Sequence, residues 1–167
     1  MSLNEWKAPR RANRFSKLAL VAAREAMEKH LGEAEASGQK VWGVIVGTAL
    51  GPHESTAQVH NDMMDFGDAG VSPTAFSHSV HNVAAAYIAQ MLDLHGPCLT
   101  VTDFVDVAGR CRDLATCWLA EGACDAVLGV VVDEAGFVFD RIEAELGEPL
   151  AGIRESAQAF LLEKGTE

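Results

Sequence analysis

Aromatic side chains, prolines and cationic residues are all scarce in this chain of 167 residues. Aromatic residues make up 7% of the sequence, five residues are proline, and 13 Lys and Arg face 24 Asp and Glu, which gives a formal net charge of -11 at pH 7. Proteins that bind nucleic acids or anionic membranes use clustered Lys and Arg to displace counterions. The charge therefore argues against both as partners. Hydrophobic residues, mostly aliphatic, make up 49% of the chain and favour one soluble α/β domain.

Long apolar segments are also missing. The longest apolar run, Ala126–Val132, is far shorter than the roughly 20 residues that a membrane-spanning helix needs. The first 14 residues are polar and basic, without the apolar region or cleavage site of a secretory signal. We therefore predict a cytoplasmic protein with no membrane span.

The sequence contains no typical metal-binding motif. Its cysteines form no CxxC pair, so we expect reduced structural thiols at Cys98, Cys111, Cys117 and Cys124. Among the histidines, only His78 and His81 lie close enough to share a helix face, and no acidic or Cys partner is near them. We predict no metal and no cofactor.

The most informative stretch, Gly96–Gly136, has the pattern of a βαβ unit. A β-favouring run follows a Gly-Pro break at Cys98–Thr102, and the almost wholly apolar Val127–Val132 is typical of a strand covered on both faces. The segment between them has apolar residues at helical spacing: Val107, Ala108, Cys111, Leu114, Ala115, Trp118 and Leu119.

The turn between this first strand and the helix, Thr102–Asp106, lies where many α/β enzymes hold a reactive group, because a helix amino terminus presents unpaired N–H groups there. Asp103 and Asp106 are good N-cap residues, and we favour capping as their role. Neither Ser nor Cys stands at this turn, and no G-x-S-x-G motif supports a serine triad.

The rest of the chain completes a three-layer α/β domain with a mixed sheet and helices on both faces. We predict a basic arm over residues 1–13 and a single domain over residues 14–167. The predicted helices are Arg14–Leu31, Ser55–Met64, Ser79–Leu94 and Gly152–Lys164. The predicted additional strands are Lys40–Thr48 and Phe137–Glu143, the latter as a possible antiparallel hairpin with Val127–Val132.

Three stretches, in order, resemble the amino-terminal half of a β-ketoacyl synthase of the thiolase fold. They are NRFSKLALVAAREAME, GVIVGTALG and SPTAFSHSVHNVAAAYIAQMLDLHGPCLTV, and together with EGACDAVLGVVVDE they cover about residues 10–135. The segment SPTAFSHSVHN most resembles the corresponding segment of chain-length-factor-like proteins of aryl polyene and related pathways. The resemblance implies one half of the thiolase fold and a role in fatty acid or polyketide biosynthesis.

The departures from the family pattern imply a non-catalytic homologue. Counting from Gly96-Pro97, the position of the family's cysteine nucleophile is Val105, which cannot form a thioester. The resemblance also does not include the family's first strand. The assisting histidines and lysine of the family belong to a carboxy-terminal half beyond the last residue of this chain. We therefore expect no 3-oxoacyl-[acyl-carrier-protein] synthase (acyltransferase) activity and no catalytic residue.

The resemblance also implies a dimer, as a homodimer or as a heterodimer with a catalytic ketosynthase. The family pairs the strand before the nucleophile, so the expected dimer edge is Cys98, Leu99, Thr100, Val101 and Thr102. The expected supporting helix contributes His81, Asn82, Ala85 and Ala86. An acyl carrier protein is a possible further partner at the basic patch Lys7, Arg10, Arg11, Arg14 and Lys17.

Two alternative functions stay open. One is an acyl-transferring enzyme of the ketosynthase family with a displaced nucleophile. The other is a stand-alone homodimeric binding or scaffold domain with no connection to acyl chains.

Overall fold

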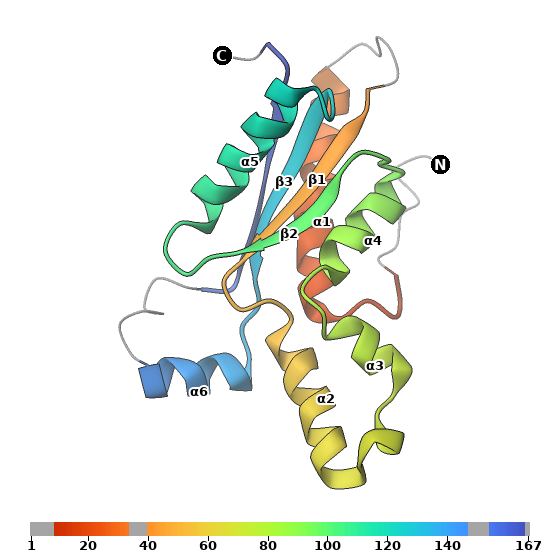
Figure 1. Ribbon diagram of the computed structural model, residues 1–167, viewed down its shortest axis with the longest axis vertical. Coiled ribbons are helices and arrows are strands. Elements are labelled where there is room, and N and C mark those ends of the chain that lie inside the picture. The colour runs from red at the N-terminus through yellow and green to blue at the C-terminus, as the bar shows by residue number, and fades with distance from the viewer. Residues whose placement is uncertain (1–8, 34–39, 147–153, 166–167) are drawn as a thin grey trace.

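The computed structural model describes residues 9–33, 40–146 and 154–165 and contains one four-stranded mixed sheet. The strand order is β2-β1-β3-β4; β1 pairs in parallel with β2 and β3, and β4 pairs antiparallel with β3 (Figure 1). The elements are α1 (Arg14–Glu33), β1 (Trp42–Thr48), α2 (His53–Phe66), η2 (Asp68–Gly70), α3 (Pro73–His78), α4 (Val83–Leu92), β2 (Cys98–Thr102), α5 (Val107–Glu121), β3 (Ala126–Asp133), α6 (Phe137–Leu146) and β4 (Ser156–Glu163).

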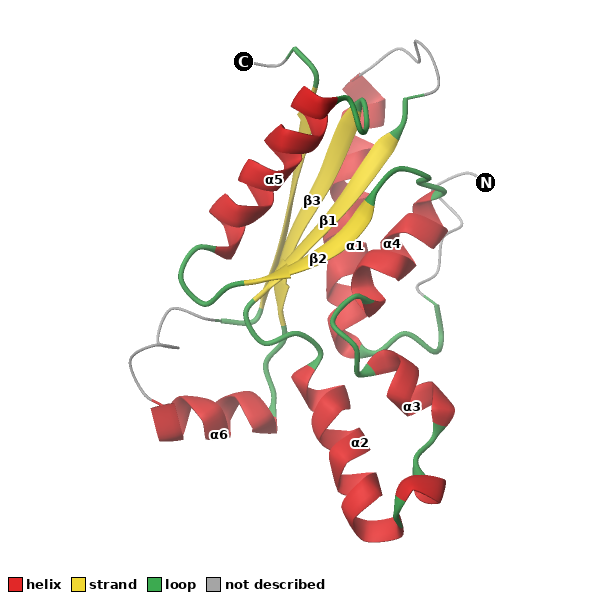
Figure 2. Cartoon of the chain, viewed as in Figure 1, coloured by secondary structure: helices red, strands yellow, loops and turns green. Residues whose placement is uncertain are grey.

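Helices cover both faces of the sheet, as the sequence predicts. Helices α1 and α4 lie on one face and α5 on the other (Figure 2). The α1/α4 side holds the larger core, in which Val44, Val46, Leu128 and Val130 are at most 1% exposed. On the α5 side, Ile45 and Val127 are fully buried, but Leu99, Val101, Phe160 and Leu162 are only partly buried. One helix therefore covers its face of the sheet less completely than two helices cover the other.

Glycine in β1 allows α5 to approach closely. A Cβ atom added to Gly47 would lie 2.5 Å from the Cys111 sulfur and 2.8 Å from a methyl group of Val107. Since real Cβ atoms do not approach so closely, only glycine permits this spacing. The position of the amino end of α5 therefore depends on this residue.

A buried carboxylate fixes the turn that leads from β1 to α2. Asp133 Oδ1 accepts hydrogen bonds from Thr48 Oγ1 (2.8 Å) and from the backbone N–H groups of Ala49 (2.9 Å) and Leu50 (3.3 Å). Asp133 is 6% exposed, and burial of an ionisable group is tolerated where it is well hydrogen-bonded. These bonds tie the carboxyl ends of the central strands β1 and β3 together.

Two predictions of secondary structure near the carboxyl terminus are wrong. The predicted strand Phe137–Glu143 is the helix α6, on which Arg141 and Glu145 form an i,i+4 ion pair of 3.1 Å. The predicted helix Gly152–Lys164 contains the strand β4 instead, and its first two residues lie outside the described part. The antiparallel partner of β3 is therefore β4 and not the segment that directly follows it.

The predicted helix Ser79–Leu94 is divided. Helix α3 ends at His78 and α4 begins at Val83. Two side chains donate hydrogen bonds to backbone carbonyls at this break. Asn13 Nδ2 donates to the His78 carbonyl (3.0 Å), and Thr56 Oγ1 donates to the Ser79 carbonyl (2.9 Å). These carbonyls are thereby hydrogen-bonded without a continuous helix.

The prediction of a three-layer α/β arrangement with a mixed sheet is confirmed, and the bounds of β2 are those expected from the sequence. Among the residues that the structure describes, no helix is long and apolar enough to cross a membrane.

Substitution Gly47→Ala is expected to lower the free energy of unfolding by about 1–3 kcal/mol, because the added methyl group overpacks the contact with Cys111. Chemical denaturation measures this change. Adding Cys111→Ala to Gly47→Ala makes room for the methyl group, so the double variant is expected to lose less than the sum of the two single variants. Simple additivity would contradict this account of the contact.

Candidate functional site

The turn between β2 and α5 presents an apolar residue where the family resemblance places a nucleophile. Val105 is 95% exposed and Phe104 is 58% exposed. The backbone N–H of Val105 donates a 2.7 Å hydrogen bond to Asp103 Oδ1, and the N–H of Asp106 donates to the same oxygen at 3.2 Å. The turn is thus organised by a carboxylate within it.

Asp106 caps α5 in the way the sequence predicts. Its Oδ1 accepts a 2.9 Å hydrogen bond from the Gly109 N–H in the first turn of the helix. Asp103 Oδ2 also accepts from Arg110 Nε at 3.2 Å. The hydrogen bonds from Val105 and Asp106, followed by the Arg110 contact, hold the pKa of Asp103 below its ordinary value. Asp103 therefore stays ionised at neutral pH.

These contacts occupy a backbone group that acyl-transfer chemistry could use. An oxyanion hole needs backbone N–H groups that point at the developing negative charge. Here the Val105 N–H is already hydrogen-bonded, and ionised Asp103 brings negative charge to the place where an oxyanion would form. The same charge would raise the pKa of a thiol rather than lower it.

The cysteines lie away from this turn, and burial raises the pKa of three of them. Cys111 and Cys124 are buried, and desolvation raises the pKa of the Cys111 thiol to about 11. Partial desolvation also raises the pKa of the Cys98 thiol at the start of β2, and burial raises that of Cys124. Since thiolate is the reactive form, these environments suit structural thiols. Cys117 is exposed on α5.

The expected dimer edge is an outer strand of the sheet. Strand β2 has β1 on one side and no described strand on the other. The Val44 N–H donates to the Pro97 carbonyl (2.8 Å) and the Asp103 N–H to the Thr48 carbonyl (3.3 Å). Hydrogen bonds alternate along a parallel strand, so the odd-numbered residues of this segment face β1. The backbone groups of Cys98, Thr100 and Thr102 consequently point to the open side.

The residues of the expected supporting helix do not share one environment. His81 and Asn82 precede α4 and are exposed, as is Ala86 within it. Ala85 is 1% exposed and belongs to the core between α1, α4 and the sheet. His78 Nε2 lies 3.0 Å from the Tyr87 hydroxyl, and no group of three or more His, Cys, Asp or Glu suited to a metal occurs among the described residues.

The buried acid Glu134, next to α2, was not predicted from the sequence. Glu134, directly after β3, is 2% exposed; its Oε1 accepts from the Glu54 N–H (3.3 Å) and lies 4.0 Å from His53 Nδ1. Burial, as the largest influence, raises the pKa of Glu134 above its ordinary value. The only signal in the sequence is a second acidic residue directly after a buried strand, which is usually read as the start of a loop.

Comparison with known proteins shows the family. Residues 4–134 match the family model "Beta-ketoacyl synthase, N-terminal domain", so the chain belongs to the β-ketoacyl synthase family. A curated relative, 3-oxoacyl-[acyl-carrier-protein] synthase 2 of Staphylococcus aureus, is 33% identical over 92 residues, which are 54% of this chain and 23% of that protein. The match thus spans less than a quarter of that relative's length.

Solved structures support the same fold. The ishigamide ketosynthase/chain length factor has a TM-score of 0.81 and 22% sequence identity, with coverage of 99% of this chain and 48% of that chain. The ketosynthase ApeO in complex with its chain length factor ApeC from Xenorhabdus doucetiae has a TM-score of 0.70 and 20% identity, with coverage of 96% and 63%. At these identities the likeness shows the thiolase-type fold.

The substitution Val105→Cys is expected to create a thiol that is exposed but not activated. The negative charge of Asp103 should keep the pKa of the introduced thiol at or above the ordinary thiol value of about 8.5. Its alkylation rate, followed by mass spectrometry against pH with Cys117 as an internal reference, measures this pKa. In the double variant Val105→Cys/Asp103→Ala the pKa is expected to fall by about one unit. A single variant with a thiol pKa well below 8 would contradict the electrostatic account.

The two acids Glu134 and Glu155 are expected to change stability with pH in opposite directions. The pKa of Glu134 is raised, so its contribution is present at acidic pH and is lost as pH rises through the folded-state pKa. The substitution Glu134→Gln keeps an oxygen acceptor for the Glu54 N–H and should raise the melting temperature at pH 7 but not at pH 4.

Glu155 serves as the matched control. Its hydrogen bond and ion pair with Arg14 (2.6 Å) lower its pKa, so its contribution is present at neutral pH and is lost as pH falls. Glu155→Gln should therefore lower the melting temperature at pH 7 and have less effect at acidic pH. The same pH dependence of the change in melting temperature in both variants would contradict the opposite pKa shifts of Glu134 and Glu155.

Proposed function

We propose that this chain is a non-catalytic β-ketoacyl synthase homologue that serves as a chain-length-factor-like subunit in fatty acid or polyketide biosynthesis, of which aryl polyene formation is one example. It assembles with a catalytic ketosynthase and helps to limit the length of the acyl product. The observation that carries the proposal is the turn at Val105, where the side chain has no nucleophilic atom and the backbone N–H donates to the carboxylate of Asp103.

The surface properties of the chain support a protein partner. The open edge of β2 offers unpaired backbone groups, and such edges favour pairing with another strand. The helical projection formed by α2, η2 and α3 (Figure 1), with the residues just after it, also exposes large apolar side chains, which is typical of interaction surfaces. These side chains are 41–74% exposed and belong to Met63, Met64, Phe66, Phe76 and Val80.

The basic residues near α1 support an acyl carrier protein as a further, transient partner. Lys7 of the expected patch lies outside the described residues. Arg10, Arg11, Arg14 and Lys17 are exposed and lie close together in the chain, which carries a formal net charge of -11. Carrier proteins are acidic, so only a locally basic patch of this chain favours their approach.

Light scattering after size exclusion tests the proposal directly. The chain is run alone and mixed with a catalytic ketosynthase from the same organism, and a complex with one copy of each is expected. The reconstituted pair, supplied with substrates on the carrier protein, should give a narrower distribution of product lengths than the ketosynthase alone. A homodimer that persists in the presence of the ketosynthase would instead support a stand-alone binding domain.

Substitution Thr100→Pro is expected to weaken association by about tenfold or more, because proline removes an outward N–H donor of β2 and places its ring against the partner strand. The hydrogen bonds to β1 use the neighbouring odd-numbered residues, so the monomer should keep its fold.

Thr100→Ala is the matched control. It removes the same side chain but keeps the amide, and its affinity for the partner should stay within about twofold of the wild-type value. Equal affinities of the proline and alanine variants would exclude pairing through the β2 edge. Circular dichroism of the monomers confirms that both variants are folded.

A further inference from the structure

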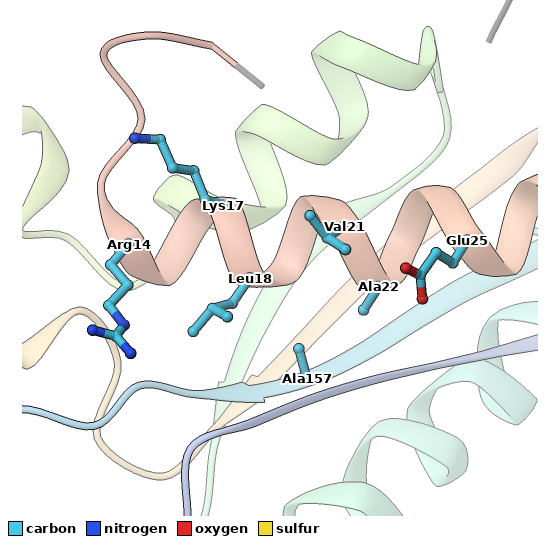
Figure 3. Close-up of a pocket in the computed structure, with 7 residues that line it drawn as sticks. All are labelled: Arg14, Lys17, Leu18, Val21, Ala22, Glu25 and Ala157. Carbon is cyan, nitrogen blue, oxygen red and sulfur yellow. The ribbon is translucent and has the colours of Figure 1, made fainter. Parts of the chain in front are cut away.

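A groove follows one flank of α1 where this helix lies over the edge strand β4. Its volume is about 630 Å³, within the range of small-molecule sites. Ala157 on β4 and six residues of α1 line it: Arg14, Lys17, Leu18, Val21, Ala22 and Glu25 (Figure 3). The groove lies at the opposite edge of the sheet from β2.

The floor of the groove is apolar because β4 presents small residues to α1. Ala157 and Ala159 face the core between α1 and the sheet, whereas Phe160 and Leu162 face α5. Figure 3 shows Leu18 and Ala22 pointing to the same side of α1, toward Ala157. Val21 at the rim is 46% exposed. A larger side chain at residue 157 would fill this space.

The two ends of the groove carry opposite charge. Arg14 and Lys17 lie at one end, in the first turn of α1, which contains no acidic residue and contributes the positive end of the helix dipole. The described contacts of Arg14 with Glu155 use only Nη2, so its other guanidinium N–H groups can bind a second acceptor. Glu25 stands at the other end (Figure 3).

We propose that this groove binds an amphiphile of the fatty carboxylate class, with one anionic head and an unbranched hydrocarbon chain. The head contacts Arg14 and Lys17, and the chain covers Leu18, Ala22 and Ala157. From Arg14 to Glu25 the helix advances by about 16 Å, which suits a chain of medium length. Glu25 disfavours the reversed orientation because it repels the head.

The site does not depend on the proposed pairing through β2, but its cationic end shares Arg14 and Lys17 with the patch proposed for a carrier protein. It lies outside the β2–α5 turn and the β2 edge, so a partner bound at β2 leaves it open. Success or failure of the heterodimer experiment therefore does not decide this proposal.

Isothermal titration calorimetry of the full chain tests the site, with sodium dodecanoate below its micelle concentration as the probe. Saturable binding of one dodecanoate per chain is expected. Dodecyltrimethylammonium has the same tail with a cationic head and should bind about tenfold more weakly or worse, while acetate, which has no tail, should show no binding. Equal binding of the two amphiphiles, or no saturable binding of dodecanoate, would overturn the proposal.

Substitutions locate the probe on the chain. Ala157→Leu fills the floor and should weaken dodecanoate binding by about tenfold or more, whereas Gln158→Leu adds the same side chain on the opposite face of β4 and should leave it unchanged. Lys17→Gln removes one charge at the head and should weaken binding by about threefold, while Lys29→Gln, on α1 but outside the groove, should not.

Thermal melting confirms that each variant is folded. Lys17 is exposed, so its variant tests the site even if Ala157→Leu disturbs the packing of β4. Binding by Ala157→Leu that equals the wild-type affinity in a folded protein, or equal effects of Lys17→Gln and Lys29→Gln, would show that dodecanoate binds elsewhere and would refute the assignment.

Discussion

The position of β1 is the constraint on which most of this structure depends. It is hydrogen-bonded to β2 on one side and β3 on the other and is buried on both faces. Glycine at residue 47 lets α5 lie directly against it, and Asp133 fixes the turn that follows it. The start of α5, the candidate site and the open edge of β2 are all placed relative to this strand.

The turn before α5 shows how one fold holds different chemistry. A strand that ends at a helix amino terminus supplies N–H groups and a positive dipole end, which can activate a thiol or stabilise an oxyanion. In this chain the same place holds Val105, and backbone N–H groups of the turn and of the first helical turn donate to the carboxylates of Asp103 and Asp106. Family membership therefore defines the scaffold, while the chemistry of the turn depends on the residues that this chain places there.

The two outer strands give the sheet two different surfaces. The β2 edge is open for backbone pairing and lies on the side of α4, whereas the β4 side carries a groove whose floor is made of small apolar residues and whose ends are charged. Backbone pairing selects another strand, while an apolar groove with a cationic end selects a small amphiphile. Because they lie at opposite edges, both surfaces can be occupied at the same time.

The sequence by itself determined the central βαβ unit, the bounds of β2 and the capping role of Asp106, whereas Asp103 accepts hydrogen bonds within the turn before the helix. These features depend on local signals: the Gly-Pro break, the continuous apolar run of β3 and the short carboxylates before a helix. The sequence also pointed to Val105, because the spacing from Gly96-Pro97 is a local count.

Tertiary structure alone decided the secondary structure of the segments after β3, α6 and β4. The segment Ser156–Glu163 has apolar residues at both helical and strand spacing, and it is a strand because it pairs with β3 from Ala126↔Glu163 to Asp133↔Ser156. The buried state of Glu134 and the groove between α1 and β4 arise in the same way, from packing between segments far apart in sequence. No local pattern carries that information, because burial and register belong to the pair of elements and not to either one.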